Sequence, residues 1–161
     1  MQVLICAALV MAPAFAAAAD VTIVRDGQPA AVIVLQPDAP DQLAEAVTEM
    51  QALIQRSTGA ALQLAEAAPA GLAEVHVGRT AYVQGLGLEL GDLDGDGFVI
   101  RFPRPDTVVI VGPTDWGTEF GLYEFLERYV GVRWLMPGPD GTYVPARRSI
   151  TVPAEPVRDE P

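Results

Sequence analysis

Two stretches of this chain carry apolar residues at helical spacing. In the first, apolar side chains recur at i, i+4, i+7 and i+11, at Leu43, Val47, Met50 and Ile54. Asp38 is placed to cap the start of this helix, with Pro40 and Asp41 in its first turn, and Gly59 is placed to end it. The pattern predicts a helix that covers one face of a sheet.

A second helix is predicted from about Asp115 to Val130. Its wide apolar face collects Trp116, Phe120, Tyr123, Leu126 and Val130. Gly117 and Gly121 lie four residues apart and predict the close approach of another backbone. Glu127 falls on the apolar side, where a structural ion pair, for example with Arg133, or a position at the helix rim is favoured over a catalytic acid.

Shorter segments that alternate or run apolar are typical of strands. Two hairpins are predicted where a turn joins two such segments: Val21–Ile23 with Ala31–Leu35, and Gly97–Phe102 with Thr107–Val111. Further short strands are predicted at Leu62–Ala65, Glu74–Gly78, Val132–Met136, Thr142–Val144 and Ser149–Val152. Strands and helices together predict an α+β fold with two layers.

The length of 161 residues suits one domain, at about 150 residues per domain. A catalytic barrel, which needs about 250 residues, does not fit within it. The net charge of -11 should repel phosphate backbones and anionic membranes, so nucleic acid is excluded as a partner.

Residues 1–19 are predicted to be a signal peptide. Val3–Met11 form an apolar core, and Ala16–Ala19 offer small-residue cleavage sites before Asp20, although no basic residue precedes the apolar core. We therefore expect an exported protein, periplasmic or extracellular, with no membrane contact after cleavage. Cys6 lies inside this segment, so the mature chain would carry no thiol.

The last residues, 153–161, have lost all periodicity and are rich in proline and charge. This composition predicts the start of a linker to a downstream domain, and residues 20–152 are then a single α/β accessory domain.

Three motifs suggest chemistry, and each has a structural alternative. Asp92, Asp94 and Asp96 match the opening of a calcium loop, but position twelve is Pro103, so an acidic turn is favoured. The segment Gly112–Gly117 imitates a phosphate-binding loop without its lysine, so a structural turn is favoured.

His76, the only histidine, lies in a predicted strand with Val75 and Val77 facing the other way. A hydrogen-bonded structural role is favoured, because a Ser-His-Asp triad or a zinc site cannot be assembled from these motifs. We assign no catalytic, cofactor-binding or metal residue, and we expect no cofactor.

The second half of the chain resembles a known family. The matching pieces are Val111–Gly112, the helix Gly117–Arg128 (G-T-x-x-G-x-Y-E-F-L-E-R), Gly131–Trp134, Pro137–Gly138 and Val144–Pro145. They resemble the N-terminal, non-catalytic α/β domain of bacterial α-glucuronidases, β-N-acetylhexosaminidases and related glycoside hydrolases. The resemblance implies a mixed β-sheet with two main helices packed on it, similar to domain 2 of β-hexosaminidases, and catalysis by a barrel domain that follows.

The resemblance implies that the partner of this domain is the catalytic barrel of the same polypeptide. Trp134, Leu135 and Met136 are candidates for the interface with that barrel, and in isolation they would form an exposed apolar patch. The alternative is a carbohydrate-binding module in which Trp116, Tyr123, Trp134 and Tyr143 stack on glycans, although core packing is favoured for the first two. Exposure decides between them, since a flat exposed aromatic row favours glycan binding.

Overall fold

The structure, a computed structural model that describes residues 19–161, is organised around a mixed five-stranded sheet. Its strand order is β10 (Val157–Asp159), β5 (Phe98–Arg104), β6 (Thr107–Val111), β4 (Ala73–Val77) and β3 (Ala31–Leu35). β3, β4 and β6 run parallel, whereas β5 and β10 join through antiparallel pairs. The predicted hairpin of β5 and β6 is therefore confirmed.

Two smaller sheets flank this one. A three-stranded antiparallel sheet contains β2 (Gln28–Pro29), β1 (Val21–Arg25) and β9 (Ile150–Val152), and β7 (Arg133–Trp134) pairs with β8 (Thr142–Tyr143). The hairpin predicted between the first two apolar segments is wrong in its second strand. β1 turns back at Asp26 and Gly27 to pair with β2, and β3 continues into the large sheet. β3 is almost wholly buried, as is typical of parallel strands covered on both faces.

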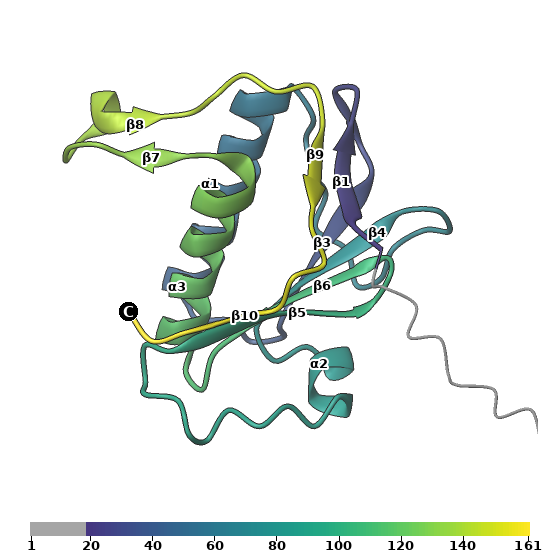
Figure 1. Cartoon of the computed structure of the whole chain (residues 1–161), viewed down its shortest axis with the longest axis vertical. Coiled ribbons are helices and arrows are strands. Elements are labelled where there is room, and N and C mark those ends of the chain that lie inside the picture. Colours follow the sequence, from purple (N-terminus) through teal and green to yellow (C-terminus); the bar gives the residue numbers. More distant parts are fainter. Residues whose placement is uncertain (1–18) are drawn as a thin grey trace, which may run out of the picture.

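Two helices cover one face of the large sheet, α1 (Asp41–Thr58) and α3 (Asp115–Phe125), the latter continued by a π-helical turn, η1 (Leu126–Val130) (Figure 1). A short helix, α2 (Ala81–Gly85), lies on the opposite face (Figure 1). The 3₁₀ turn η2 (Pro139–Gly141) sits between β7 and β8. The predicted fold class, α+β with a mixed sheet and two main helices, is confirmed.

The side chains of each strand alternate between two cores. On β6, Val108 and Ile110 join the main core beneath α1 and α3, whereas Val109 and Val111 join a smaller core beneath α2. The smaller core also holds Val83 of α2. α2 and the irregular chain that follows it, which adds Leu90 and Leu93 to the smaller core, thus cover the second face of the sheet.

The first helix begins later than its predicted cap. Asp38 adopts a left-handed conformation, with φ of 53°, and Pro40 occupies the cap position without a side-chain hydrogen bond. Aspartate tolerates this conformation, so Asp38 turns the chain toward the helix instead of capping it. At the other end Gly59, with φ of 81°, donates its N–H to the Gln55 carbonyl at 2.7 Å, as predicted for a helix stop.

The second helix approaches the sheet through its glycines, as predicted. A methyl group at Gly117 would lie 2.2 Å from the Gly97 carbonyl oxygen, and one at Gly121 would lie 3.1 Å from the Phe98 side chain. The Thr114 hydroxyl caps the helix by accepting the Gly117 N–H at 3.0 Å.

The end of the chain is ordered as a strand. Val157–Asp159 forms β10, which pairs with β5 in the register Val157 to Ile100. The composition of residues 153–161 predicted a linker and did not indicate this strand. The antiparallel pairing with β5 satisfies the backbone N–H and C=O groups of the strand. Cys6 and all but the last residue of the predicted signal peptide, residues 1–19, lie outside the described part of the chain. Within residues 19–161 no helix is long and apolar enough to span a bilayer.

Candidate docking surface

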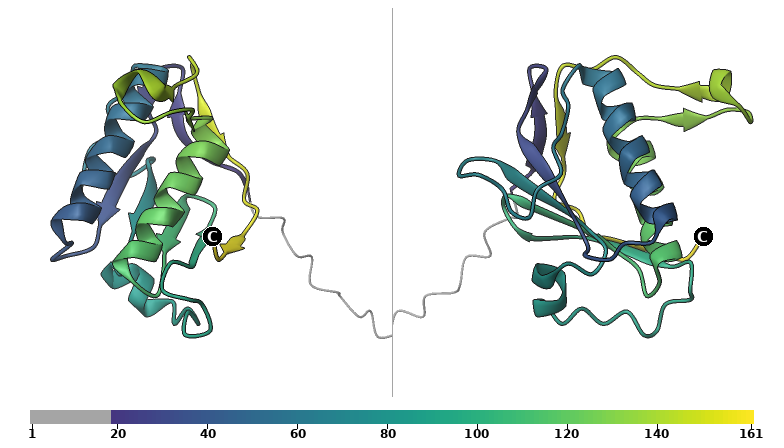
Figure 2. Two further views of the ribbon diagram at one scale, coloured as in Figure 1. Left: turned by 90° about the vertical axis from the view of Figure 1, so that its left-hand side faces the viewer. Right: turned by 180° about the vertical axis from the view of Figure 1, so that it is seen from behind.

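The hairpin of β7 and β8 extends away from the body of the domain and carries the predicted interface residues (Figures 1 and 2). Trp134 is 37% exposed, Leu135 71%, Met136 64% and Tyr143 54%. The structure thus brings all four candidates onto one hairpin and leaves them open to solvent. The exposed apolar patch that the sequence predicts is present.

Close backbone contacts hold this hairpin in shape. The Leu135 N–H donates to the Gly141 carbonyl at 2.8 Å, and a side chain at Gly141 would collide with the Met136 carbonyl oxygen. Arg133 anchors the base by donating from Nη1 to the Glu127 main-chain oxygen at 2.8 Å. Arg133 was a predicted partner of the Glu127 carboxylate, but the contact is to the main chain, and Glu127 lies half-buried at the helix rim.

The outer side of α3 continues the exposed apolar surface. Trp116 is 53% exposed, so its predicted place in the core is wrong. The physical reason is the pair of glycines, because the helix contacts the sheet through Gly117 and Gly121 and Trp116 is left at the edge. Trp116 meets Phe120 edge to face, with ring centroids 5.4 Å apart and planes at 84°.

Tyr123 links this helix side to the hairpin. Its ring meets that of Trp134 edge to face, with centroids 5.3 Å apart and planes at 88°. Its hydroxyl donates to the Glu49 carboxylate of α1 at 2.9 Å. Burial, together with the Glu49 carboxylate, raises the pKa of Tyr123, so the phenol stays protonated. Trp116, Phe120, Tyr123 and the hairpin therefore form one surface, called the docking surface below.

The C-terminus lies beside this surface. A hollow of about 200 Å³ between α3 and the hairpin is lined by Phe120, Tyr123 and Trp134 together with Asp159 and Pro161. Figure 2 shows the C-terminus and the hairpin on the same side of the molecule as the outer faces of α1 and α3. The sequence could not reveal this neighbourhood, because it depends on β10 joining the sheet.

The acidic turn lies elsewhere, in the loop between α2 and β5. Asp92 pairs with Arg158 of β10 at 2.5 Å, and this partner lowers the pKa of the Asp92 carboxyl. Within residues 19–161, no three His, Cys, Asp or Glu side chains gather closely enough to hold a metal ion, and Asp94 and Asp96 form no such group with Asp92.

The loop that imitates a phosphate site serves as a turn. The Gly112 N–H donates to the Thr118 hydroxyl at 3.0 Å, and the Thr114 hydroxyl donates to the Gly95 carbonyl. The Gly112 and Gly117 amides and the Thr114 and Thr118 hydroxyls thus bond within the protein itself.

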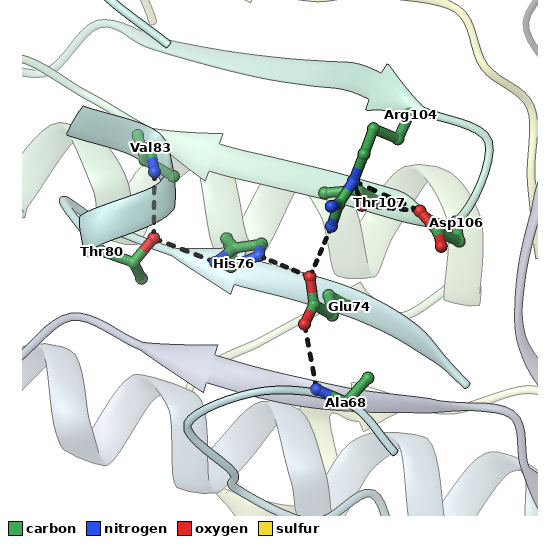
Figure 3. A network of polar contacts seen from close by, with 8 residues as sticks. All are labelled: Ala68, Glu74, His76, Thr80, Val83, Arg104, Asp106 and Thr107. Carbon is green, nitrogen blue, oxygen red and sulfur yellow. Dashed lines mark hydrogen bonds and ion pairs between the residues drawn. The ribbon is translucent and has the colours of Figure 1, made fainter. Parts of the chain in front are cut away.

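A polar network, buried at His76 and Thr80 and open to solvent at Arg104, joins β4 to α2 (Figure 3). His76 is 3% exposed, and its Nδ1 lies 3.0 Å from the Thr80 hydroxyl while its Nε2 lies 3.2 Å from the Glu74 carboxylate. Arg104 donates to the same carboxylate at 2.7 Å. The ring of Tyr82 stacks on His76 with centroids 4.8 Å apart.

The arrangement sets a hydroxyl, an imidazole and a carboxylate in line, although no sequence motif indicates such a set. The Thr80 hydroxyl, however, is buried and accepts the Val83 N–H that begins α2. A buried capping hydroxyl cannot reach a substrate, so the network is structural, as predicted for His76.

Burial dominates the electrostatics of His76. It lowers the pKa of the imidazole, Arg104 acts in the same direction, and Glu74 opposes both. For Glu74, burial acts to raise the pKa, but the Ala68 N–H, His76 and Arg104 outweigh it, so the pKa of Glu74 is lowered. In the folded protein His76 is therefore neutral and Glu74 is charged at neutral pH.

We expect the free energy of unfolding to fall as the pH drops below about 6.5. The unfolded chain protonates His76 there and the folded chain does not, so stability is complete above the unfolded pKa and is lost toward the lower folded pKa, by at most about 1.4 kcal/mol per pH unit. Urea unfolding between pH 7.5 and 5.5 measures this slope. Because the chain has one histidine, His76→Gln should abolish it; an unchanged slope in that variant would contradict the assignment.

Solved structures of several glycoside hydrolases share this fold. A GH20 β-N-acetylhexosaminidase from Streptomyces coelicolor A3(2) matches with a TM-score of 0.53 and 16% identity, over 89% of this chain and 24% of its own. An N-acetyl-β-hexosaminidase from Streptomyces plicatus matches with a TM-score of 0.53 and 16% identity, over 89% and 23%. A family GH115 4-O-methyl-α-glucuronidase with specificity for decorated arabinogalactans matches with a TM-score of 0.57 and 13% identity, over 88% and 18%.

This chain thus spans about a quarter or less of the length of those enzymes. At such low identity the likeness shows the fold alone. Among curated proteins none matches the chain significantly. The sequence does match the N-terminus of glycosyl hydrolase family 67 over residues 20–125, which is more than half of the chain. The predicted resemblance to an N-terminal domain of glycoside hydrolases is confirmed, and the chain belongs to the family of glycosyl hydrolase family 67 N-terminal domains.

Proposed function

We propose that this domain is a non-catalytic accessory domain of an exported glycoside hydrolase, and that it docks against the catalytic barrel through the docking surface. The observation that carries the proposal is where the exposed apolar side chains gather. Of the six large hydrophobic side chains exposed in residues 19–161, Trp116, Trp134, Leu135, Met136 and Tyr143 lie on α3 or on the hairpin, and only Leu64 lies elsewhere. Such a patch on an otherwise acidic protein marks a surface that another protein covers.

The geometry of the rings favours docking over glycan stacking. Tyr123 and Trp134 meet at 88°, and Trp116 and Phe120 meet at 84°. Sugar rings stack on flat exposed faces, whereas these pairs interlock edge to face and leave an irregular surface. Leu135 and Met136, the most exposed members, add apolar area that offers no face to a sugar. An interface core is the better match, because such cores are enriched in aromatic residues and methionine.

The position of the C-terminus also supports docking. Pro161 lines the same hollow as Trp134, so a following domain would be tethered next to the docking surface. A short tether gives a high effective concentration, which makes even a modest interface persistent. Export is proposed on the sequence of residues 1–19 alone.

The reading frame beyond Pro161 tests the proposal. We expect it to encode a barrel of about 250 residues. In the longer polypeptide, amide hydrogen exchange of residues 133–143 should be roughly tenfold slower than in the 161-residue chain, because docking removes the hairpin from water.

The control is the 161-residue chain itself, which should turn over neither aryl α-glucuronides nor aryl β-hexosaminides. A stop codon followed by an unrelated gene, equal exchange of the hairpin in both proteins, or robust turnover by the short chain would each overturn the proposal.

A further inference from the structure

Two adjoining hollows run along the outer side of α3 and share Phe120 and Tyr123. One, of about 120 Å³, is completed by Trp116 and Glu119. The other, of about 200 Å³, includes Trp134, Glu127 and Asp159. The two together form one furrow with an aromatic floor and an acidic rim, called the α3 groove below and defined by Phe120, Tyr123, Trp134, Glu119, Glu127 and Asp159.

No basic side chain lines either hollow. Arg128 is paired at 2.5 Å with Glu124, which also lines the larger hollow, and its charge acts on Asp159 without an ion pair between them. Arg133 donates to main-chain oxygens. Glu119 accepts a hydrogen bond from Gln42 at 2.5 Å, and Asp159 accepts the Glu160 N–H at 2.9 Å. Within residues 19–161, the carboxylates of Glu119, Glu127 and Asp159 therefore form no ion pair.

Aromatic faces beside unneutralised carboxylates attract cations for two separate reasons. A guanidinium within about 6 Å of a ring centroid is held by the negative face of the ring. Carboxylates bind its planar fork through paired N–H donors. Glu119 and Glu127 are half-buried, so solvent screens their charge less than it would at an open surface.

We propose that the α3 groove receives an arginine side chain of the catalytic domain, which deepens the proposed function and rests on it. Arginine fits better than lysine, because its flat guanidinium stacks on rings while it bonds to carboxylates. The net charge of -11 would also attract a basic surface to the domain. The apolar hairpin would supply buried area for the interface. The arginine in the α3 groove would fix how the two domains align.

Titration of the 161-residue chain with N-acetyl-arginine amide, followed by NMR, tests the groove directly. We expect saturable shifts at the Trp134 indole and at the rings of Tyr123 and Phe120, with affinity roughly tenfold above that of N-acetyl-citrulline amide, the neutral analogue of similar shape. The double variant Glu119→Gln/Glu127→Gln should lose roughly tenfold in affinity for the arginine probe.

The matched control is Glu66→Gln/Glu89→Gln, which removes the same net charge from exposed positions away from the groove and should bind like the parent. Equal affinity for the arginine and citrulline probes, shifts outside the groove, or equal losses in the two double variants would overturn the proposal. If amide exchange of the hairpin is slower in the longer polypeptide but the arginine probe does not bind, only the proposal for the α3 groove is refuted. Arginine binding without hairpin protection would instead refute the proposed docking.

Discussion

Replacing Gly117 with alanine is expected to lower the free energy of unfolding by roughly 3 kcal/mol and the melting temperature by roughly 10 °C. The new methyl group would lie 2.2 Å from the Gly97 carbonyl oxygen and 3.0 Å from the Gly95 oxygen. Both neighbours are backbone, so no side chain can rotate away, and α3 must lift from the loop that precedes β5. Urea unfolding followed by circular dichroism measures the change.

The matched control is Gly85→Ala. Gly85 also lies in a helix, but its added methyl group meets no atom within 4 Å, and its φ is not positive. Alanine has the higher helix propensity, so this variant should be neutral or more stable by up to about 1 kcal/mol. A Gly117→Ala protein with the stability of the Gly85→Ala protein would contradict the close approach on which the placement of α3 depends.

Local pattern predicted most of the regular elements. Apolar periodicity located α1 and α3, and the Gly117 and Gly121 spacing predicted the close approach of α3 to the sheet. The π-helical turn Leu126–Val130, in which the Gly131 N–H bonds to the Leu126 carbonyl at 2.9 Å, was not predicted. Each hydrogen bond of a π-helix spans one residue more than in an α-helix. In so short a segment this difference leaves no distinct spacing of apolar residues in the sequence.

Pairings between distant segments were the hardest part to predict. β3 follows β1 in sequence but joins another sheet, and β10 closes the large sheet from a stretch with the composition of a linker. The short pairings involve few residues, so periodicity carries little information about them. The strand partner supplies the information that the local sequence lacks, since Val157 pairs with Ile100 of β5.

In the docking surface, too, one part could be predicted from local sequence and another part could not. Trp134, Leu135 and Met136 belong to an apolar run that ends at Pro137 and Gly138, and their exposure was predicted. Tyr143 was named as a candidate without a prediction of its exposure. Trp116 was assigned to the core, because a helical wheel cannot tell which arc of a broad apolar face meets the sheet. The place of Asp159 in the adjoining α3 groove depends on the pairing of β10 and could not be predicted from local sequence.

Removing the apolar tip of the hairpin should separate docking from folding. In the double variant Leu135→Ser/Met136→Ser, the free energy of unfolding of the 161-residue chain should change by less than about 0.5 kcal/mol, since both side chains are mostly in solvent. Burial of two such side chains in an interface contributes about 3 kcal/mol, so the affinity of the separated domain for its catalytic domain should fall roughly 100-fold. Calorimetric titration of the two separated domains measures the loss.

Leu64 provides the matched comparison, because it is the other exposed leucine within residues 19–161 and lies beside β3, outside the hollows that border α3. Leu135→Ser alone should weaken binding roughly tenfold, whereas Leu64→Ser should leave it unchanged. Equal effects of the two serines would mean that exposed apolar area in general, rather than the hairpin, drives association. Unchanged binding in the double variant would place the interface on another face, and the edge-to-face rings of Tyr123 and Trp134 would then serve only to fix the hairpin on α3.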